Sequence, residues 1–234
     1  MQFSSPTSRP EDGLYLPENA GWFTRLRVAV RALRVLEKQP DDSVAAPLLT
    51  ASLDGDTFAK LVAELENTAE GRLLLRDRPS LQKGTIDLDV LQALPRDTLG
   101  HAFARYYADN GIAPFESPYV VRNDVDFAVK RFRETHDLVH VVTGYGTDAL
   151  GEMELQAFLV GNLGLRTSIL ILTFAALLRP HGLPPIWKYT DKLKRAYRRG
   201  RESEKVVRHH YERFWEITLE DARRLLGIPP LAAA

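Results

Sequence analysis

The chain contains no cysteine, and this excludes disulfide bonds, thiolate metal sites and cysteine nucleophiles. Any metal site must therefore use nitrogen and oxygen ligands. An excess of one charge is also absent, because lysine plus arginine and aspartate plus glutamate number 31 each among the 234 residues. A neutral chain has no overall attraction for nucleic acid or anionic lipid. Any such surface must be local, and we expect no nucleic-acid partner.

Long apolar runs are missing as well. The longest, interrupted by one threonine, covers 169–178 and reads ILILTFAALL. It is well short of the roughly 18 to 20 residues that cross a bilayer. The N-terminal segment carries Glu11 and Asp12 and has no long apolar core, unlike a secretory signal or an arginine-rich transit peptide. We therefore expect a cytoplasmic protein that lies peripherally at the inner face of a membrane.

Strand-like alternation is weak throughout, whereas helical periodicity is strong. The expected helices cover 22–36, 57–65, 98–107, 125–142, 149–178, 187–205 and 219–226. The chain length suits one domain with a sizeable core. We therefore predict an all-α protein, a single-domain helical bundle over 21–234 that is preceded by a flexible tail over 1–20.

Two of these segments have the composition of membrane-docking helices. In the first, apolar and basic side chains lie on separate faces: Phe23, Leu26, Val30 and Leu33 on one, and Arg27, Arg31 and Arg34 on the other. The second covers 187–201, WKYTDKLKRAYRRGR, and interleaves aromatic with basic residues. Each pattern is typical either of peripheral membrane contact or of an ordinary solvated basic face.

Four side chains able to bind a metal or handle a proton lie within 136–152, which reads HDLVHVVTGYGTDALGE. On a helix over 125–142, His140 falls about 40° and Asp137 about 100° round from His136, so all three project to one side. The two-glycine turn that follows ends this helix and allows a second one to begin near Asp148. The short turn then brings Glu152 back towards the histidines.

Two imidazoles with one or two carboxylates suit zinc, iron(II) or manganese, and the carboxylates also allow magnesium. The alternative is that the HDxxH string lies on a solvated helix face or caps a helix end. The position of Glu152 after the turn, and the presence here of two of only six histidines, favour a metal site. We assign the other histidines to surface or capping positions: His101, His181, His209 and His210.

The string HDLVH, followed after eleven residues by Glu152, resembles the HDxxH, x11, E signature of the ubiquinone (coenzyme Q) biosynthesis Coq-four family. Four other stretches resemble family landmarks in family order: GRLLLRDRPSL (71–81), LPRDTLG (94–100), RFRETHD (131–137) and YERFWE (211–216) followed by LLGI. The resemblance covers most of the chain from about 71 to 228.

This resemblance implies an all-helical fold and a divalent metal, usually taken as zinc, on the positions that match His136, Asp137, His140 and Glu152. It also implies a prenylated hydroxybenzoate or related isoprenoid lipid as ligand, and two roles. One is removal of the ring's C1 carboxyl with hydroxylation at that carbon. The other is non-catalytic: a lipid-binding scaffold that organises a complex of coenzyme Q biosynthesis enzymes. A homodimer is compatible with either.

A lipid tail would need an apolar channel beside the ion, because burial of each CH2 contributes roughly 0.8 kcal/mol. Gln156, Leu159 and Leu163 follow Glu152 on one side of the second helix, within about 80° of each other, and we predict that they line such a channel. The alternative is that the leucines are ordinary core. At the head group, the ion would stabilise charge as the carboxyl leaves. Glu152 and Glu134 are the predicted catalytic carboxylates, with Glu134 as an outer proton-handling group.

Two rival hypotheses remain from the residues themselves. In the scaffold, the metal would be structural, and four protein ligands would close its coordination. A metal-dependent phosphohydrolase built on a histidine–aspartate dipeptide would need His101 and a later aspartate, Asp148 or Asp191, in the same pocket. The landmark stretches do not favour the phosphohydrolase, so we rank it last.

Overall fold

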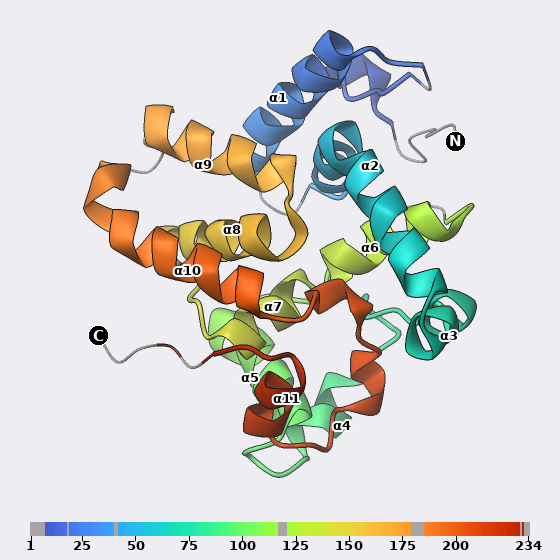
Figure 1. Ribbon diagram of the computed structural model, residues 1–234, viewed down its shortest axis with the longest axis vertical. Coiled ribbons are helices and arrows are strands. Elements are labelled where there is room, and N and C mark those ends of the chain that lie inside the picture. Colours follow the sequence, from blue (N-terminus) through green and yellow to red (C-terminus); the bar gives the residue numbers. More distant parts are fainter. Residues whose placement is uncertain are drawn as a thin grey trace.

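The structure is a computed structural model that describes residues 8–17, 19–39, 42–116, 121–178, 185–229 and 231. Within these ranges the chain forms helices and isolated bridges but no strand, which confirms the all-α fold (Figure 1). The α-helices are α1 Trp22–Lys38, α2 Ala45–Glu66, α3 Ala69–Asp77, α4 Leu88–Gln92, α5 Leu99–Asn110, α6 Asp124–Glu134, α7 His136–Thr143, α8 Ala149–Leu163, α9 Arg166–Leu178, α10 Thr190–Glu202 and α11 Leu219–Leu225.

The N-terminal segment is packed where the structure describes it. Leu14 and Leu16 are 0% and 2% exposed and join side chains of α1 and α2 in one buried cluster. Arg9 Nη2 donates a hydrogen bond of 2.8 Å to Asp42 Oδ2, which ties the segment to the start of α2. Residues 8–17 therefore differ from the flexible tail expected over 1–20, whereas residues 1–7 and 18 lie outside the described residues.

The buried face of α1 is not the face that periodicity indicates. Its buried side chains are Val28, Ala29, Ala32 and Leu33. These pack in one cluster with α2, because the two alanines leave room for a close helix. Phe23, expected on the inner face, is 86% exposed at the start of the helix. Arg27, Arg31 and Arg34 are exposed as expected.

Helix α2 begins twelve residues before the expected start at Thr57. Asp42 accepts backbone hydrogen bonds from Val44 and Ala45 at 3.1 and 2.7 Å and so caps it. The part of α2 from Ala45 to Gly55 is buried on all sides. A helix buried all round has no polar face and therefore no amphipathic period, which is why its sequence gave no helical signal.

Two expected continuous helices are each broken in two. The range 125–142 divides at Thr135, whose Oγ1 donates to the backbone oxygen of Arg131 at 2.9 Å and so favours a bend. The range 149–178 divides at Gly164, which takes a left-handed conformation with φ of 71°. Asp54 of α2 then accepts hydrogen bonds from the backbone nitrogens of Arg166 and Thr167 at 2.7 and 3.0 Å. This carboxylate fixes the start of α9 beside α2.

Helices α8 and α10 lie side by side (Figure 1) and touch backbone to backbone. A Cβ on Gly161 would lie 2.1 Å from the carbonyl oxygen of Tyr197, and one on Gly200 would lie 2.1 Å from that of Phe158. Only glycine fits at both positions. Asn162 locks the contact further, because its Nδ2 donates to the carbonyl oxygens of Gly200 and Glu204 at 3.1 and 2.9 Å.

The remaining helices agree with expectation in part. The ranges 98–107 and 219–226 form α5 and α11, and 187–205 forms a short 3-10 turn, Ile186–Tyr189, followed by α10. Helices α3 and α4 were not expected, because each is short. Among the described residues, we find no helix with the length and hydrophobicity needed to span a bilayer.

Candidate metal centre

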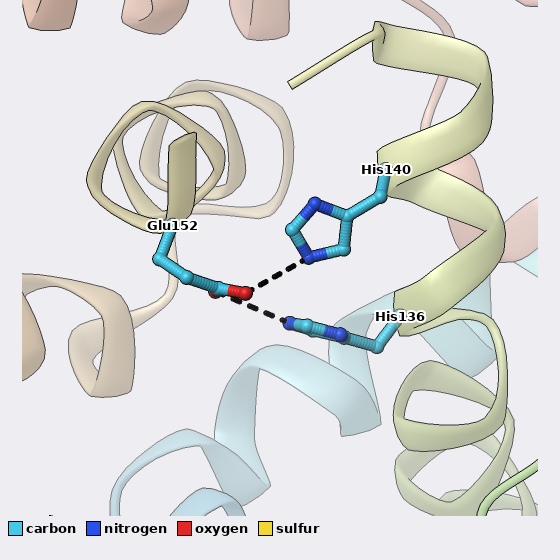
Figure 2. A group of neighbouring side chains, drawn as sticks. All are labelled: His136, His140 and Glu152. Carbon is cyan, nitrogen blue, oxygen red and sulfur yellow. Dashed lines mark ion pairs between the residues drawn. The ribbon is translucent and has the colours of Figure 1, made fainter. Parts of the chain in front are cut away.

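The histidines of the cluster lie on α7, which begins at His136 and ends at Thr143. The helix stops because Gly144 takes a left-handed conformation, with φ of 77°. After the turn, Asp148 Oδ1 caps α8 by accepting hydrogen bonds from the backbone nitrogens of Leu150 and Gly151 at 2.8 and 2.9 Å. The cap places Glu152 in the first turn of α8, where its carboxylate faces α7 (Figure 2).

Three side chains from these two helices converge on one point. Ligand atoms of His136, His140 and Glu152 all lie within 4.8 Å of one another. Figure 2 shows the carboxylate of Glu152 facing both imidazoles from the opposite helix, with Oε1 3.2 Å from His140 Nε2 and Oε2 4.0 Å from His136 Nε2. The imidazoles are four residues apart on one face of α7, which is the spacing that brings side chains together on a helix. The set can hold a divalent cation.

His140 is set up as a ligand rather than as a hydrogen-bonded core residue. Its side chain is 1% exposed, and its Nδ1 lies 3.1 Å from the carbonyl oxygen of Tyr145. A carbonyl can only accept, so in the neutral imidazole the proton sits on Nδ1 and the lone pair is on Nε2. Within the described part of the chain, Nε2 is buried without a hydrogen bond of acceptable geometry, despite the nearby Glu152 oxygen. An orphaned buried nitrogen of this kind fits a metal.

Charges within the cluster shift its pKa values. Burial lowers the pKa of His140, but the adjoining Glu152 carboxylate and the Tyr145 carbonyl outweigh burial, and the pKa lies above its ordinary value. Burial raises the pKa of Glu152, yet the two imidazoles outweigh it and the pKa lies below its ordinary value. Glu152 is therefore ionised at neutral pH, and it can offer an anionic oxygen to a cation beside two nitrogen ligands.

Asp137 lies beside the three ligands but does not join them. Its Oδ2 accepts a hydrogen bond of 2.9 Å from the hydroxyl of Tyr107, and its Oδ1 lies 3.4 Å from His136 Nδ1. Burial raises the pKa of Asp137, but His136, Arg133 and Tyr107 outweigh it and lower the pKa. The carboxylate is thus placed to hold His136 by its far nitrogen, as outer carboxylates do at metal sites. In place of four converging ligands, the structure gathers three.

The structure does not bring Glu134 to this cluster. It is 3% exposed and accepts hydrogen bonds from the hydroxyl of Ser80 at 2.8 Å and the backbone nitrogen of Leu81 at 3.2 Å, and it also pairs with Lys130. The carboxylate anchors the segment after α3. Its neighbour two positions on, His136, points elsewhere because the bend at Thr135 begins a new helix.

Among the described residues, the group of possible metal ligands includes neither His101 nor Asp148 or Asp191, which a phosphohydrolase would need. The ring of His101 contacts the carbonyl oxygen of Gln92 at 2.9 Å, and Asp148 is used as the cap of α8.

A cleft of about 570 Å³ opens beside the three ligands. Its polar wall comes from α5, α7 and α8 and its apolar wall from α1, α2 and α9: Tyr106, His136, Asp137, Glu152 and Gln156 on one side, and Leu33, Leu36, Ala46, Ile171, Phe174 and Ala175 on the other. The volume lies within the range typical of ligand sites, about 300 to 1,000 Å³. The cleft joins an ion site to an apolar surface.

The residues expected to line the lipid channel are only partly in this cleft. Gln156 lines it, but Leu159 is 1% exposed and belongs to the main core, and Leu163 packs against that core. The reason is the glycine contact between α8 and α10, which turns the later part of α8 towards α10. The apolar wall is supplied instead by helices distant in sequence, α1 and α9.

Arg133 and Tyr106 are site residues that the sequence analysis missed. Arg133 lies three residues before His136, lines the cleft, and stacks its guanidinium over the ring of Phe115 at 4.5 Å. Among the described residues no carboxylate forms an ion pair with it, and its Nε is buried without a hydrogen bond. Tyr106 lies against His140 with ring centroids 5.8 Å apart. The three-residue spacing from Arg133 to His136 was a signal that could have found it.

Comparison with known proteins agrees with the signature in the sequence. The family model described as coenzyme Q (ubiquinone) biosynthesis protein Coq4 matches residues 21–232. The chain belongs to the Coq4 family. Members of this family are proteins of ubiquinone biosynthesis, so the resemblance stated from the residues 71–228 is confirmed. The match also extends to α1 and α2, where the sequence analysis saw no clear landmark.

Individual Coq4 proteins are similar over most of the chain. The ubiquinone biosynthesis protein COQ4 homolog of Danio rerio is 31% identical over 75% of this chain and 66% of its own length. The COQ4 protein of Coprinopsis cinerea is 26% identical over 94% of this chain and 76% of its own. The crystal structure of a candidate ubiquinone biosynthesis protein from Nostoc punctiforme has a TM-score of 0.69 and 25% identity, covering 87% of this chain and 96% of that one.

These relatives also correct one expectation. The sequence predicted a cytoplasmic protein at the inner face of a membrane, but the Danio rerio, Coprinopsis cinerea and Xenopus laevis relatives are named as mitochondrial proteins. The cytoplasmic prediction is therefore contradicted. It depended on the composition of the N-terminal segment alone, and that composition does not determine the compartment of a mature protein.

Proposed function

We propose that this chain holds a divalent metal, zinc in the first instance, on His136, His140 and Glu152, and that it promotes removal of the C1 carboxyl from a prenylated hydroxybenzoate bound in the adjoining cleft. The observation that carries the proposal is that a single cleft contains both metal ligands and an apolar wall. Two of the ligand side chains, His136 and Glu152, and an apolar wall line the same space of about 570 Å³, and the third ligand, His140, is buried beside them. A ligand with a polar aromatic head and an isoprenoid tail fits both ends.

The number of protein ligands favours a catalytic metal site over a purely structural one. A structural zinc is normally closed by four protein ligands, whereas a catalytic one has three and keeps a position open. Here the described residues provide three, with Asp137 held aside by Tyr107. When bound, the metal would supply Lewis acidity and charge stabilisation to ring oxygens that reach its open position. Iron(II) or manganese would suit the same nitrogen and oxygen donors, and magnesium remains compatible with the carboxylates.

The protein's own groups would orient the substrate. Arg133 lines the cleft near the ligands, and although its charge acts on Asp137 and Glu152, it forms no ion pair with a carboxylate among the described residues. Its guanidinium can therefore take a carboxylate of the substrate in a bidentate pair. Tyr106 and Gln156 provide further polar contacts around the ring. The tail would lie along Leu36 and Phe174, which exclude water from the reacting end. The carboxyl leaves as carbon dioxide. Where a hydroxyl replaces it, one atom of dioxygen enters the ring and the other leaves as water, with two electrons and two protons from an external two-electron reductant.

Complementation of a ubiquinone-deficient strain tests this function. Wild-type protein should restore ubiquinone, whereas Glu152→Ala should not, and mass spectrometry should find an accumulated prenylated intermediate that still carries its C1 carboxyl. A Glu134→Gln variant serves as the control, because that carboxylate contacts Ser80, Leu81 and Lys130 and is not part of the ligand group. Simultaneous loss of the other biosynthetic enzymes, without a carboxylated intermediate, would contradict the enzymatic role and support a non-catalytic scaffold that binds them.

The role of Arg133 is tested by binding alone. A prenylated 4-hydroxybenzoate and its carboxamide are titrated into wild type and Arg133→Gln. The acid should bind wild type about ten- to hundredfold more tightly than the carboxamide, and the variant should lose this preference, because one charge-assisted pair is removed. Equal binding of both ligands by wild type would refute the role of Arg133, and no binding of either would refute the cleft as the lipid site.

Membrane contact is a further part of the proposal, because prenylated lipids reside in bilayers. At the start of α1, Trp22 and Phe23 are 53% and 86% exposed, one turn before the exposed Arg27. Aromatic and basic side chains in this arrangement suit an anionic interface. Liposome flotation should show binding to anionic vesicles that falls on charge reversal of Arg27, Arg31 and Arg34. Unchanged flotation would contradict the contact.

A further inference from the structure

A second cavity, of about 610 Å³, lies away from the metal cleft. It is bounded by the end of α7, the last turns of α10, helix α11 and the segment that follows α11. Its walls include Thr143, Arg199, Arg223, Arg224 and Leu231. Within the described part of the chain, two of the three arginines, Arg199 and Arg223, form no ion pair, and nothing in the metal chemistry proposed above uses them.

Arg199 is a buried guanidinium that is only partly satisfied. It is 9% exposed, and its Nη2 donates to the carbonyl oxygens of Thr143 and Pro229 at 3.1 and 2.8 Å. Its Nη1 is buried and has no hydrogen-bond partner within the described ranges. The ring of Tyr145 lies under the group, 5.0 Å from ring centroid to Cζ. Its hydroxyl interacts electrostatically with Arg199, but no hydrogen bond to it of acceptable geometry occurs among the described residues. A buried cation with a free donor calls for an acceptor.

Arg223 adds a second positive charge. Its Nε and Nη2 donate to the carbonyl oxygens of Val142 and Val141 at 2.9 and 3.2 Å. Arg199 and Arg223 both line the cavity, and burial and the charge of Arg199 lower the pKa of Arg223. Within the described residues, neither guanidinium forms an ion pair with a carboxylate, in contrast to Arg224, which pairs with Glu220 and Asp221.

The carbonyls at the end of α7 offset only part of this charge. A helix C-terminus carries about half a negative charge, against two full positive charges on Arg199 and Arg223. Glu220 also lines the cavity, but its carboxylate lies 3.2 Å from Arg224. The charge of Glu154 also acts on Arg199, but it is shared with Lys192 and Arg195. A net positive charge therefore remains, and it is presented by planar guanidinium groups, which match the oxygens of phosphate better than an ammonium does.

We propose that this cavity is an oxyanion site in which Arg199 and Arg223 bind a phosphate group, either free phosphate or a phosphate monoester. Ile228 and Leu231 add apolar surface to the cavity, which suits an organic substituent on the ester. The site lies against the last turn of α7 and shares Tyr145 with His140, because the Tyr145 carbonyl faces His140 Nδ1 while its ring supports Arg199. An anion here would hold the end of the helix that carries the metal ligands.

Inorganic phosphate is the first probe. It is titrated into the full chain by calorimetry at constant ionic strength, with chloride as the compensating salt. We expect saturable binding by wild type, and a loss of about ten- to hundredfold in affinity in Arg223→Gln, the effect of one charge-assisted hydrogen bond. Phenyl phosphate is titrated in parallel to distinguish the two possible ligands. Tighter binding of phenyl phosphate than of phosphate would indicate a phosphate monoester as the ligand, and equal binding would indicate free phosphate.

Arg198→Gln is the matched control. Arg198 is exposed and adjacent to Arg199, so its removal deletes the same charge without touching the cavity. We expect less than about a twofold change in phosphate affinity. Because Arg199→Gln can impair folding, Arg199→Lys is used beside it, and circular dichroism confirms the fold of each variant. An equal loss in Arg198→Gln and Arg223→Gln, or no saturable binding by wild type, would overturn the site and would leave the metal proposal untouched.

Discussion

Asp137→Asn tests how the candidate metal centre is built. The residue belongs to the HDxxH string, yet its carboxylate lies against the hydroxyl of Tyr107 at 2.9 Å and 3.4 Å from His136 Nδ1. Asparagine keeps an oxygen for Tyr107 but loses the charge that holds the imidazole. Loss of an outer carboxylate typically lowers metal affinity about ten- to hundredfold, which is about 1.4 to 2.7 kcal/mol. We expect an effect of this size, with one metal ion still bound per chain.

The measurement is a zinc titration in competition with a chelator, together with metal analysis of the purified protein. His140→Asn is the comparison, because it removes a direct ligand and should abolish stoichiometric binding. If Asp137→Asn lost the metal as completely as His140→Asn does, Asp137 would be a ligand and the three-ligand description would be wrong. An affinity equal to wild type would show instead that the carboxylate does not position His136.

Three further predictions concern stability. Gly161→Ala should lower the free energy of unfolding by about 1 to 3 kcal/mol in denaturant titration, because its Cβ would lie 2.1 Å from the Tyr197 oxygen, whereas Gly21→Ala, with no atom within 4 Å, should change it little. Asp54→Ala should cost about 1 to 2 kcal/mol through loss of the cap of α9, and metal stoichiometry should stay unchanged. Burial lowers the pKa of His209 below its ordinary value of 6.5, so the unfolded chain binds a proton at this residue more readily than the folded chain does. The free energy of unfolding should therefore fall as the pH drops from about 6.5 towards the pKa of His209 in the folded protein. His209→Gln should reduce this acid dependence in thermal unfolding at stepped pH, and an unchanged pH profile would contradict it.

The candidate metal centre was predictable because its parts are close in sequence. His136 and His140 share a helix face by their spacing, and the short turn with Gly144 and Gly146 places Glu152 opposite them. The role of Asp137 could not be read in the same way. Its neighbour Tyr107 lies thirty residues earlier on another helix, and only the folded packing decides that this carboxylate turns towards the phenol.

The cleft could not be predicted, because its apolar wall comes from α1 and α9. Leu36 and Phe174 are separated by most of the chain, and no periodic pattern relates them. Leu159 and Leu163 had the expected apolar character but not the expected direction. The first half of α2 was missed for a related reason, since a helix surrounded by other helices has no polar side to reveal its period.

The close packing of α8 against α10 at Gly161 and Gly200 also bears on the candidate metal centre. It fixes the rotation of α8 about its axis from a point more than two helical turns beyond Glu152. The direction of the third ligand thus depends on two residues without a functional group as well as on the Asp148 cap. We expect a methyl group at Gly161 or Gly200 to shift the Glu152 carboxylate relative to the imidazoles. A survey of tolerated substitutions that covered only the ligands would not reveal this constraint.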